Sequence, residues 1–313
     1  MLSKEEINQQ LKFLINETDF SSLGDKYLGK VRDCYGQADK LYIITSDRIS
    51  CFDKIITSIP FKGQVLTELA MHWFKLSESI AQNHIIDHPD PNVMVVKKCE
   101  IFPIEVVVRG YLTGSAWRDY QKGKAISGIK LPMGLKMSQK FSEPIITPST
   151  KAEKGMHDLP ISEKEIIDRK IVDVGLWKEA RTIALKLFKI GQKEADKNGL
   201  ILVDTKYEFG MHKGELLLAD EIHTLDSSRY WLKETYSSKF EQNDLPDMLD
   251  KEVVRQWLIG QNFMGEGEVP FVSDEYRIQI AEHYIRSFEK ITGKLFLGKV
   301  EDPIARIKKN LGI

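Results

Sequence analysis

The sequence predicts an α+β fold with a strand-rich N-terminal part, a larger mixed part and a helical C-terminus. In the first third, short apolar runs alternate with polar turns, whereas apolar residues recur at helical spacing near the C-terminus. The regular strand–helix alternation of a parallel sheet is absent. The N-terminal strands are therefore expected to form an antiparallel sheet.

The N-terminal elements follow from periodicity and turn residues. Runs 27–35 and 40–46 flank the polar turn 36–39 and predict a hairpin. Apolar residues at helical spacing predict an amphipathic helix over about 65–83. Strands are expected again at 93–97 and 104–109.

The middle begins with an irregular stretch, 123–160, rich in Gly, Pro and Ser. Ser162 and Glu165 form a capping-box pattern at a helix start. A long helix through Trp177 ends near Asn198-Gly199, and strands are expected at 200–204 and 215–220. Helices follow around 254–258 and after the N-cap residue Ser273.

Composition limits the class of protein. Of the 313 residues, 42% are hydrophobic and 29% are charged, which excludes a disordered chain. The net charge of −1 argues against a nucleic-acid partner. It has no apolar run of about 18 residues, so no membrane span is expected. Three scattered cysteines without a CxxC motif and a polar N-terminus without a signal peptide predict a cytoplasmic protein with reduced thiols.

Three charged residues alternate after the long helix. Asp204, Lys206 and Glu208 follow four apolar residues in LILVDTKYEFG (200–210), so a strand places them on one face. Asp220 joins that face if the intervening turn has an odd number of residues. Clustered carboxylates beside a lysine suit a divalent cation that carries phosphates, with the lysine facing phosphate oxygens. The alternative is a solvated strand face with ion pairs.

A second set lies in the segment Gly29-Lys30-Val31-Arg32. The glycine permits close backbone approach, and Lys30 and Arg32 on one strand face would complete a phosphate cradle. The alternative is a charged edge strand. Asp47 and Arg48 similarly place an acid and a base just after a strand.

Two arginines mark possible anion sites further along the chain. Arg109 and Ser115 flank a glycine-rich turn that suits a phosphate monoester, unless it is an ordinary strand-to-helix turn. Asp226 and Arg229 would hold a second anion or cap a helix.

Six segments, in this order and spacing, resemble the SAICAR synthetase family (phosphoribosylaminoimidazole-succinocarboxamide synthases) of purine biosynthesis. They are GKVRDCY (29–35), TSDRISCFD (45–53), EVVVRGYLTGSAWRDY (105–120), EPIITPSTKAEKGMHD (143–158), LILVDTKYEFG (200–210) and LADEIHTLDSSRYW (218–231). Together they span most of the chain.

The resemblance implies an ATP- and Mg²⁺-dependent ligase that joins CAIR (carboxyaminoimidazole ribonucleotide) to L-aspartate, with an acyl phosphate as the intermediate. It implies an ATP-binding lobe over 1–105, reminiscent of ATP-grasp and kinase lobes, and a substrate- and metal-binding lobe over 106–245. ATP would lie between these lobes, and helices over 246–313 would pack on them. Only small-molecule partners are implied; the state expected is a monomer or a small homo-oligomer.

The resemblance also implies roles for individual residues. The implied sets are Glu208 and Asp220 for Mg²⁺ and ATP; Lys206 with these two for catalysis; Gly29, Lys30 and Arg32 for the triphosphate; Arg109, Ser115 and Arg229 for the CAIR phosphate; Asp204 and Asp226 for substrate; and Lys151 in the 149–158 loop for aspartate.

Two other functions stay open. A phosphotransferase could use the same ATP site on another acceptor, although no HRDxxxxN catalytic loop occurs. A catalytically inactive nucleotide-binding protein is the other, although Lys206, Glu208 and Asp220 are all present. The roles of His157 and His223 are undetermined.

Overall fold

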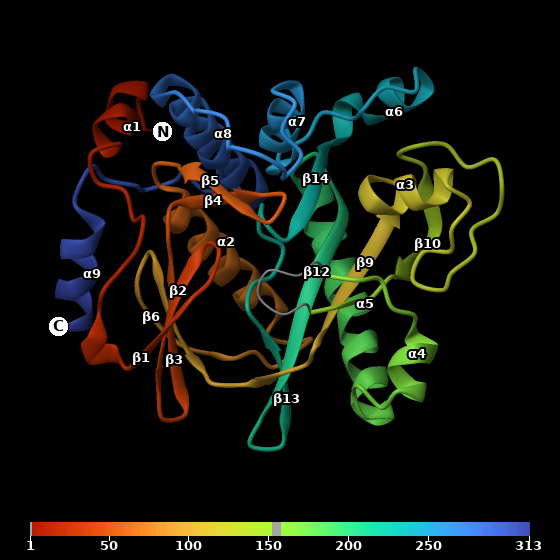
Figure 1. The fold of residues 1–313 in the computed structure, drawn as a ribbon, viewed down its shortest axis with the longest axis horizontal. Helices are drawn as coiled ribbons and strands as arrows, with labels where there is room; N and C mark the ends of the chain where they lie inside the picture. The colour runs from red at the N-terminus through yellow and green to blue at the C-terminus, as the bar shows by residue number, and fades with distance from the viewer. Residues whose placement is uncertain (1, 152–157) are drawn as a thin grey trace. The chain divides into compact units, whose positions relative to one another are not determined.

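The computed structural model describes residues 2–151 and 158–313, which fold into two compact units (Figure 1). Unit 1 contains the chain up to Trp73 together with His84–Lys98 and Asp250–Ile313. Unit 2 contains Phe74–Asn83 and Cys99–Leu249. The C-terminal helices thus belong to the same unit as the N-terminal strands, and the division at 105 and 245 stays a prediction.

Unit 1 is built on a five-stranded antiparallel sheet in the order β1-β2-β3-β7-β6. A separate two-stranded ribbon, β4–β5, lies in the same unit. The antiparallel N-terminal sheet expected from the sequence is confirmed. Its strands are β1 (Asp25–Leu28), β2 (Arg32–Gln37), β3 (Lys40–Thr45), β4 (Arg48–Cys51), β5 (Lys54–Ser58), β6 (Ile85–Asp90) and β7 (Val93–Lys97).

The predicted N-terminal hairpin is present as β2 and β3, with Gln37 opposite Lys40. The run 27–35, however, is two strands, because the chain turns between Leu28 and Arg32. The amide of Gly29 donates to the carbonyl of Arg32 at 2.8 Å and closes this turn. Lys30 therefore lies in a turn, and the prediction that it shares a strand face with Arg32 is wrong.

The helices of unit 1 come from both ends of the chain. Helix α2 ends earlier than the predicted residue 83, and Ser273 caps α8 as predicted. The helices are α1 (Lys4–Gln10), the 3-10 turn η1 (Ser21–Leu23), most of α2 (Lys62–Ser77), α7 (Glu252–Gly260), α8 (Asp274–Thr292) and α9 (Pro303–Leu311).

Helix α9 completes the core of this sheet. Ile307 is fully buried in a cluster with Tyr35, Ile44 and Val93 from β2, β3 and β7. The neighbouring Arg306 donates to both oxygens of buried Asp90 at 2.9 and 3.2 Å. The ion pair compensates the buried carboxylate, which would otherwise oppose folding.

Unit 2 contains a seven-stranded sheet with β12 at its centre. Strands β9 and β8 pair with one edge of β12, and β14 and β13 pair with the other. The strands are β8 (Glu100–Ile101), β9 (Ile104–Tyr111), β10 (Lys140–Ile146), β11 (Ser149–Thr150), β12 (Leu200–His212), β13 (Glu215–Ala219) and β14 (Ser228–Leu232).

Strand β12 is longer than predicted. It runs through the expected turn region and forms a hairpin with β13, in which Lys213 and Gly214 are the two loop residues. Both have positive φ, 51° and 86°, as a type I′ turn requires. The turn therefore holds an even number of residues, and the pairing alone does not place Asp220 on the face of Glu208.

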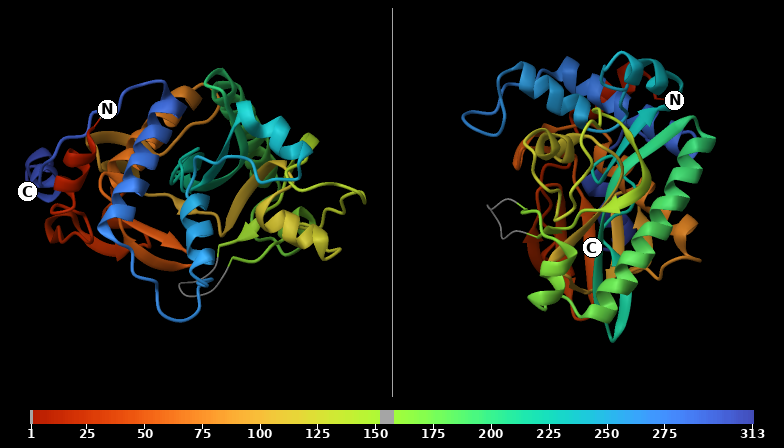
Figure 2. Two further views of the ribbon diagram at one scale, coloured as in Figure 1. Left: turned by 90° about the horizontal axis from the view of Figure 1, so that it is seen from above. Right: turned by 90° about the vertical axis from the view of Figure 1, so that its right-hand side faces the viewer.

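Helix α5 (Val174–Lys197) packs on β12 and β9, as the right-hand view of Figure 2 shows. Asp173 caps its first turn, and it ends before Asn198, as predicted. Gly191 is buried against the sheet: a Cβ there would lie 2.4 Å from Cε1 of His223 and 2.6 Å from the Leu202 side chain. The close approach of α5 to β12 thus requires glycine.

The remaining helices of unit 2 flank the sheet. The predicted capping box of Ser162 and Glu165 is present at α4. The stretch 123–160 is less irregular than expected, since β10 and β11 pair with β9. Its start packs around Ile126 with Leu112 and Ala116. The helices are α3 (Gly114–Gln121), α4 (Glu163–Asp168) and α6 (Lys233–Glu241).

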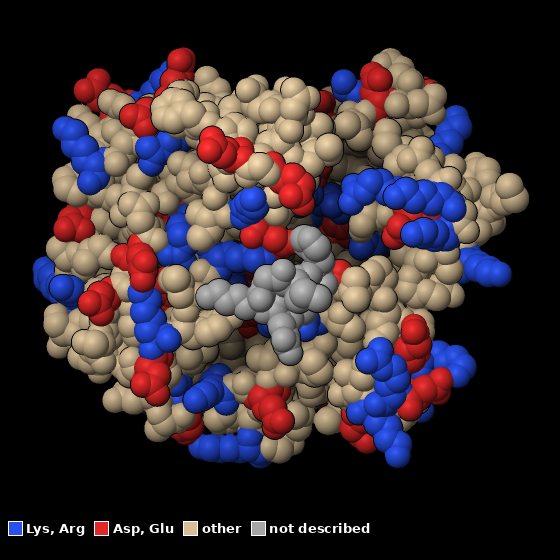
Figure 3. All heavy atoms as spheres, viewed as in Figure 1, with Lys and Arg blue, Asp and Glu red and all other residues tan. Residues whose placement is uncertain are grey.

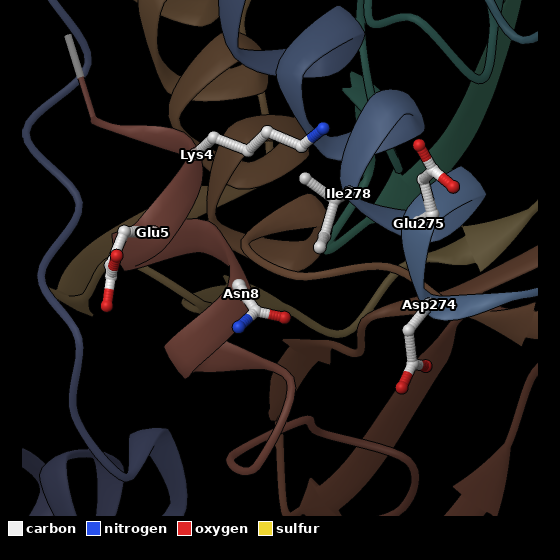
Figure 4. Close-up of a pocket in the computed structure, with 6 residues that line it drawn as sticks. All are labelled: Lys4, Glu5, Asn8, Asp274, Glu275 and Ile278. Carbon is white, nitrogen blue, oxygen red and sulfur yellow. The ribbon is translucent and has the colours of Figure 1, made fainter.

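The surface carries both signs of charge. Basic and acidic side chains are intermingled over the face drawn in Figure 3, in keeping with the net charge of −1. Between α1 and α8, Lys4, Asn8, Asp274 and Ile278 help to line a pocket that contains none of the predicted site residues (Figure 4). Of the helices described here, none is long and apolar enough to cross a membrane.

We predict that Gly191→Ala destabilises the protein by about 1–3 kcal/mol, because the methyl group overlaps His223 and Leu202 in a packed core. The matched control is Gly260→Ala in α7, where a Cβ meets nothing within 4 Å. It should be neutral or stabilise by up to about 1 kcal/mol. Urea unfolding measures both; equal stability of the two variants would contradict the close packing of α5.

Candidate active site

Strand β12 brings charged residues of three strands into register. Asp204 lies directly opposite Arg109 of β9 on one side and Arg229 of β14 on the other. Lys206 and Glu208 continue the same face by strand alternation, as predicted. Arg229 lies within a strand, so the alternative that the 226–229 segment caps a helix is wrong.

Asp204 binds both arginines. Its Oδ2 accepts hydrogen bonds from Nη1 of Arg229 at 2.5 Å and from Nη1 of Arg109 at 3.2 Å. The Arg109 side chain is 11% exposed and that of Arg229 is 20% exposed. Two guanidinium groups share one carboxylate, so this group of three, the arginine cluster, has a net charge of +1 and suits an anion.

The start of α3 approaches the arginine cluster. Nη2 of Arg109 donates to Oγ of Ser115 at 3.3 Å, and its Nε donates to Oγ1 of Thr147 at 2.8 Å. Gly114 has φ 59°, and a Cβ there would lie 2.6 Å from Nη2 of Arg229. The glycine therefore leaves room for a guanidinium that any side chain would displace. Arg109 and Ser115 come together as predicted.

A second charged group, the lysine cluster, follows on the same strand face. Nζ of Lys206 donates to Glu105 at 2.8 Å and to Glu208 at 3.0 Å. Nζ of Lys151 donates to the other oxygen of Glu208 at 2.5 Å. Glu105 and Glu208 are both buried, so the two amines compensate carboxylates that are largely removed from water.

These contacts set the charge states. Burial alone would lower the pKa of Lys206, but Glu208, Glu105 and Asp220 outweigh it and raise that pKa well above its ordinary value. Burial raises the pKa of Glu105, with Lys206 opposing the shift. The pKa of Lys151 is also raised, because Glu208 outweighs the effect of burial. Lys206 is therefore expected to carry its positive charge at neutral pH.

Asp220 follows β13 and lies near the lysine cluster. It has φ 64°, and its charge helps to raise the pKa values of Lys206 and Lys151. Within the part of the chain that the structure describes, no three His, Cys, Asp or Glu side chains form a metal-binding group. Two carboxylates, Glu208 and Asp220, still fit Mg²⁺, which typically binds one or two carboxylates together with nucleotide phosphates.

The segment Gly29–Arg32 lies in unit 1. Lys30 forms an ion pair with Asp53, both about half exposed. The cations are carried by a turn and the start of β2 rather than by one strand face. A turn between two strands can still present backbone amides and a lysine to phosphate oxygens.

Other predicted residues are placed less decisively. Asp226 is half-buried, and its amide donates to Oγ1 of Thr224 at 3.3 Å. His157 lies outside the described residues. His223 is fully buried, its Nε2 lies 2.5 Å from the Tyr207 hydroxyl, and burial lowers its pKa to about 3. It is therefore a neutral core residue.

Sequence reasoning missed Glu105 and Thr147. Glu105 lies two alternate positions before Arg109 on β9, so strand periodicity could have placed it on the charged face. Thr147 follows β10, and its segment carried no turn or charge pattern that pointed to Arg109.

Comparisons with known proteins identify the family of the chain. A family model described as SAICAR synthetase matches residues 25–270. The chain belongs to the SAICAR synthetase family. A phosphoribosylaminoimidazole-succinocarboxamide synthase of Legionella pneumophila (strain Paris) is 45% identical over 306 residues, 94% of this chain and 97% of that protein. Its counterpart in Bacteroides fragilis (strain YCH46) is 46% identical over 305 residues, 95% of this chain and 97% of that protein.

Solved structures of SAICAR synthetases have the same fold. The SAICAR synthase from Saccharomyces cerevisiae, complexed with SAICAR, has a TM-score of 0.79 at 33% identity and covers 91% of this chain and 100% of its own. A SAICAR synthetase (Type-2) in complex with ADP has a TM-score of 0.67 at 28% identity, with 88% and 100% covered. The predicted α+β family fold is confirmed, and the chain is an enzyme, a ligase.

We predict that Lys206→Met destabilises the protein in a pH-dependent way. Without the amine, the pKa of Glu105 rises further above its unfolded value, so stability is retained at low pH and lost as pH rises through the folded-state pKa. The free energy of unfolding should fall by roughly 2–3 kcal/mol at about pH 8 and by less at about pH 5. The value is smaller than that for breaking a fully buried ion pair, because Lys206 is partly exposed.

Urea unfolding of the wild type and variant at both pH values measures this difference. Lys206→Arg keeps the positive charge beside Glu105 and should show little of the pH dependence. An equal loss for Lys206→Met at both pH values would contradict the ion-pair assignment.

Proposed function

We propose that the chain joins CAIR and L-aspartate at the expense of ATP, giving SAICAR, ADP and phosphate. Family membership over residues 25–270 supports this activity. The observation that supports this activity at the site is the row of charges on β12. Asp204, Lys206 and Glu208 each contact a charged partner from a neighbouring segment.

The chemistry explains why such a site needs cations. A carboxylate is a poor acyl donor, so an oxygen of the CAIR carboxylate attacks the γ-phosphorus of ATP and ADP leaves. The aspartate amine then attacks the acyl carbon, phosphate leaves with the bonding electrons, and the amine loses a proton. Negative charge accumulates in both steps, so fixed cations lower both barriers.

In this proposal the lysine cluster serves phosphoryl transfer. Lys206 stays charged and stabilises negative charge on the transferred group and on the CAIR carboxylate. Glu208 and Asp220 would hold Mg²⁺, which supplies charge neutralisation for the ATP phosphates when bound. Glu208 would then exchange part of its contact with Lys151 and Lys206 for the metal.

The arginine cluster suits the phosphate of CAIR. Arg109 and Arg229 provide a net positive charge around Asp204, and Ser115 adds a hydroxyl at the start of α3. Guanidinium groups bind phosphate oxygens with charge-assisted hydrogen bonds. Asp204 would act by orienting both arginines.

Unit 1 would serve the same reaction through Gly29, Lys30 and Arg32, which we assign to the ATP triphosphate. Lys151 is our candidate for L-aspartate, since its side chain is 43% exposed and its amine lies beside Glu208. Asp226 is a further candidate for substrate binding. We also propose a cytoplasmic enzyme, monomeric or a small homo-oligomer, whose partners are these small molecules rather than nucleic acid or membrane.

The decisive assay is ADP release from purified protein with Mg-ATP, CAIR and L-aspartate, omitting each in turn. Release that requires all three, with an equal amount of SAICAR formed, supports the ligase. Release without aspartate would indicate uncoupled acyl-phosphate formation. No release from folded, ATP-binding protein would favour a phosphotransferase with another acceptor or an inactive homologue.

We predict that Asp220→Asn lowers Mg²⁺-dependent turnover about 100-fold or more while the protein stays folded, because a charged metal ligand becomes neutral. The matched control is Asp168→Asn on α4, which is 55% exposed and pairs only with Lys164 among the ion pairs described. Turnover at varied Mg²⁺ measures the effect. Normal turnover by folded Asp220→Asn would refute the metal assignment.

A further inference from the structure

Arg48 binds the backbone of the turn between β1 and β2 from the inside. The side chain starts in β4 and is buried, with 5% of the residue exposed. Its Nε donates to the carbonyl oxygen of Lys30 at 2.9 Å, and its Nη2 donates to that of Gly29 at 3.1 Å. Its Nη1 donates to the carbonyl of Asn16. One guanidinium thus holds three carbonyls.

Asp33 fixes this guanidinium in place. Oδ1 of the fully buried Asp33 accepts from Nη2 of Arg48 at 2.7 Å. Its Oδ2 accepts from the amide of Thr18 at 2.6 Å and from the Thr18 hydroxyl at 2.9 Å. The hydroxyl of Tyr35 lies 2.9 Å from that of Thr18. The guanidinium is therefore held by a connected, buried network.

Every carbonyl of the turn is engaged within the protein. Those of Gly29 and Lys30 accept from Arg48, and that of Val31 accepts from the amide and hydroxyl of Ser46 at 3.0 and 2.9 Å. That of Arg32 accepts from the amide of Gly29. No acceptor in the turn is therefore left to repel an anion.

Two amides of the turn, in contrast, make no hydrogen bond within the described residues. In a trans peptide the N–H points away from the C=O, so carbonyls held inward by Arg48 leave the amides of Lys30 and Val31 pointing away from it. Within residues 2–151 and 158–313, neither amide has a hydrogen-bond acceptor. The turn therefore offers two N–H donors next to the Lys30 amine.

We propose that Arg48 is a positioning residue for nucleotide binding. It holds the peptides of Gly29 and Lys30 in the orientation that presents the amides of Lys30 and Val31 to phosphate oxygens of ATP. Asp33 acts through Arg48. The inference rests on the proposed function, in that the turn is taken to bind the triphosphate. Arg48 itself, being buried behind the turn, does not touch the nucleotide.

The test is Arg48→Lys, which keeps the charge but replaces a planar, multi-donor group by a single ammonium that cannot hold three carbonyls. Calorimetry compares ATP and ADP with adenosine, which has no phosphate, and with CAIR. We expect ATP and ADP to bind about 10- to 100-fold more weakly, because two hydrogen bonds to a charged ligand are misaligned. Adenosine and CAIR should bind as to the wild type.

Lys30→Ala separates this inference from the proposed function. If Lys30→Ala weakens ATP binding and Arg48→Lys does not, the turn binds nucleotide and the role of Arg48 is refuted. If neither variant weakens it, the triphosphate assignment itself is wrong. An equal loss for adenosine and ADP in Arg48→Lys would show a merely structural role.

A measurement on the wild type covers the case in which Arg48→Lys does not fold. The amide resonances of Lys30 and Val31, assigned with Lys30→Arg and Val31→Ile, should move downfield on addition of ADP and stay in place with adenosine. Amides that do not respond to ADP, or respond equally to adenosine, would overturn the proposal.

Discussion

The bond of Asp204 to two arginines is the interaction on which the rest of the site depends. Arg109 and Arg229 come from strands on opposite sides of β12, and each is largely buried. Without a carboxylate between them, two like charges would face each other out of water, at a considerable cost. Asp204 therefore makes two neighbouring arginines compatible with a stable fold, and it leaves one positive charge uncompensated.

In the lysine cluster, buried charges are again compensated by opposite charges, but here no positive charge is left over. Two amines, of Lys206 and Lys151, contact two buried carboxylates, of Glu105 and Glu208. Asp220 adds further negative charge nearby. One strand face thus carries a group with net positive charge and, two residues further on, a group in which carboxylates balance the amines. This order of charges is the one that the proposed reaction requires, with the CAIR phosphate at the first group and Mg-ATP at the second.

The sequence predicted the charged residues of β12 because strand alternation is a local property. It also predicted α5, since apolar residues recur at helical spacing from Trp177 and Asn198-Gly199 marks the helix end. The sequence did not reveal which distant segments pair with each other. Glu105 reaches Lys206 only because β9 pairs with β12, and Thr147 reaches Arg109 from a segment 38 residues further along the chain. Lys30 was misplaced because the chain turns at Gly29, which bonds to Arg32 and to Arg48, and periodicity alone does not reveal these contacts.

The arrangement of unit 1 has a consequence for how the protein folds during synthesis. Its sheet is made of strands within the first hundred residues, yet Ile307 completes their core and Arg306 neutralises Asp90. All strands of the sheet of unit 2 lie within Cys99–Leu249, so they are synthesised before α9. On the ribosome, unit 2 can therefore reach its native packing first, while the earlier-made strands of unit 1 wait for α9 with part of their apolar surface uncovered.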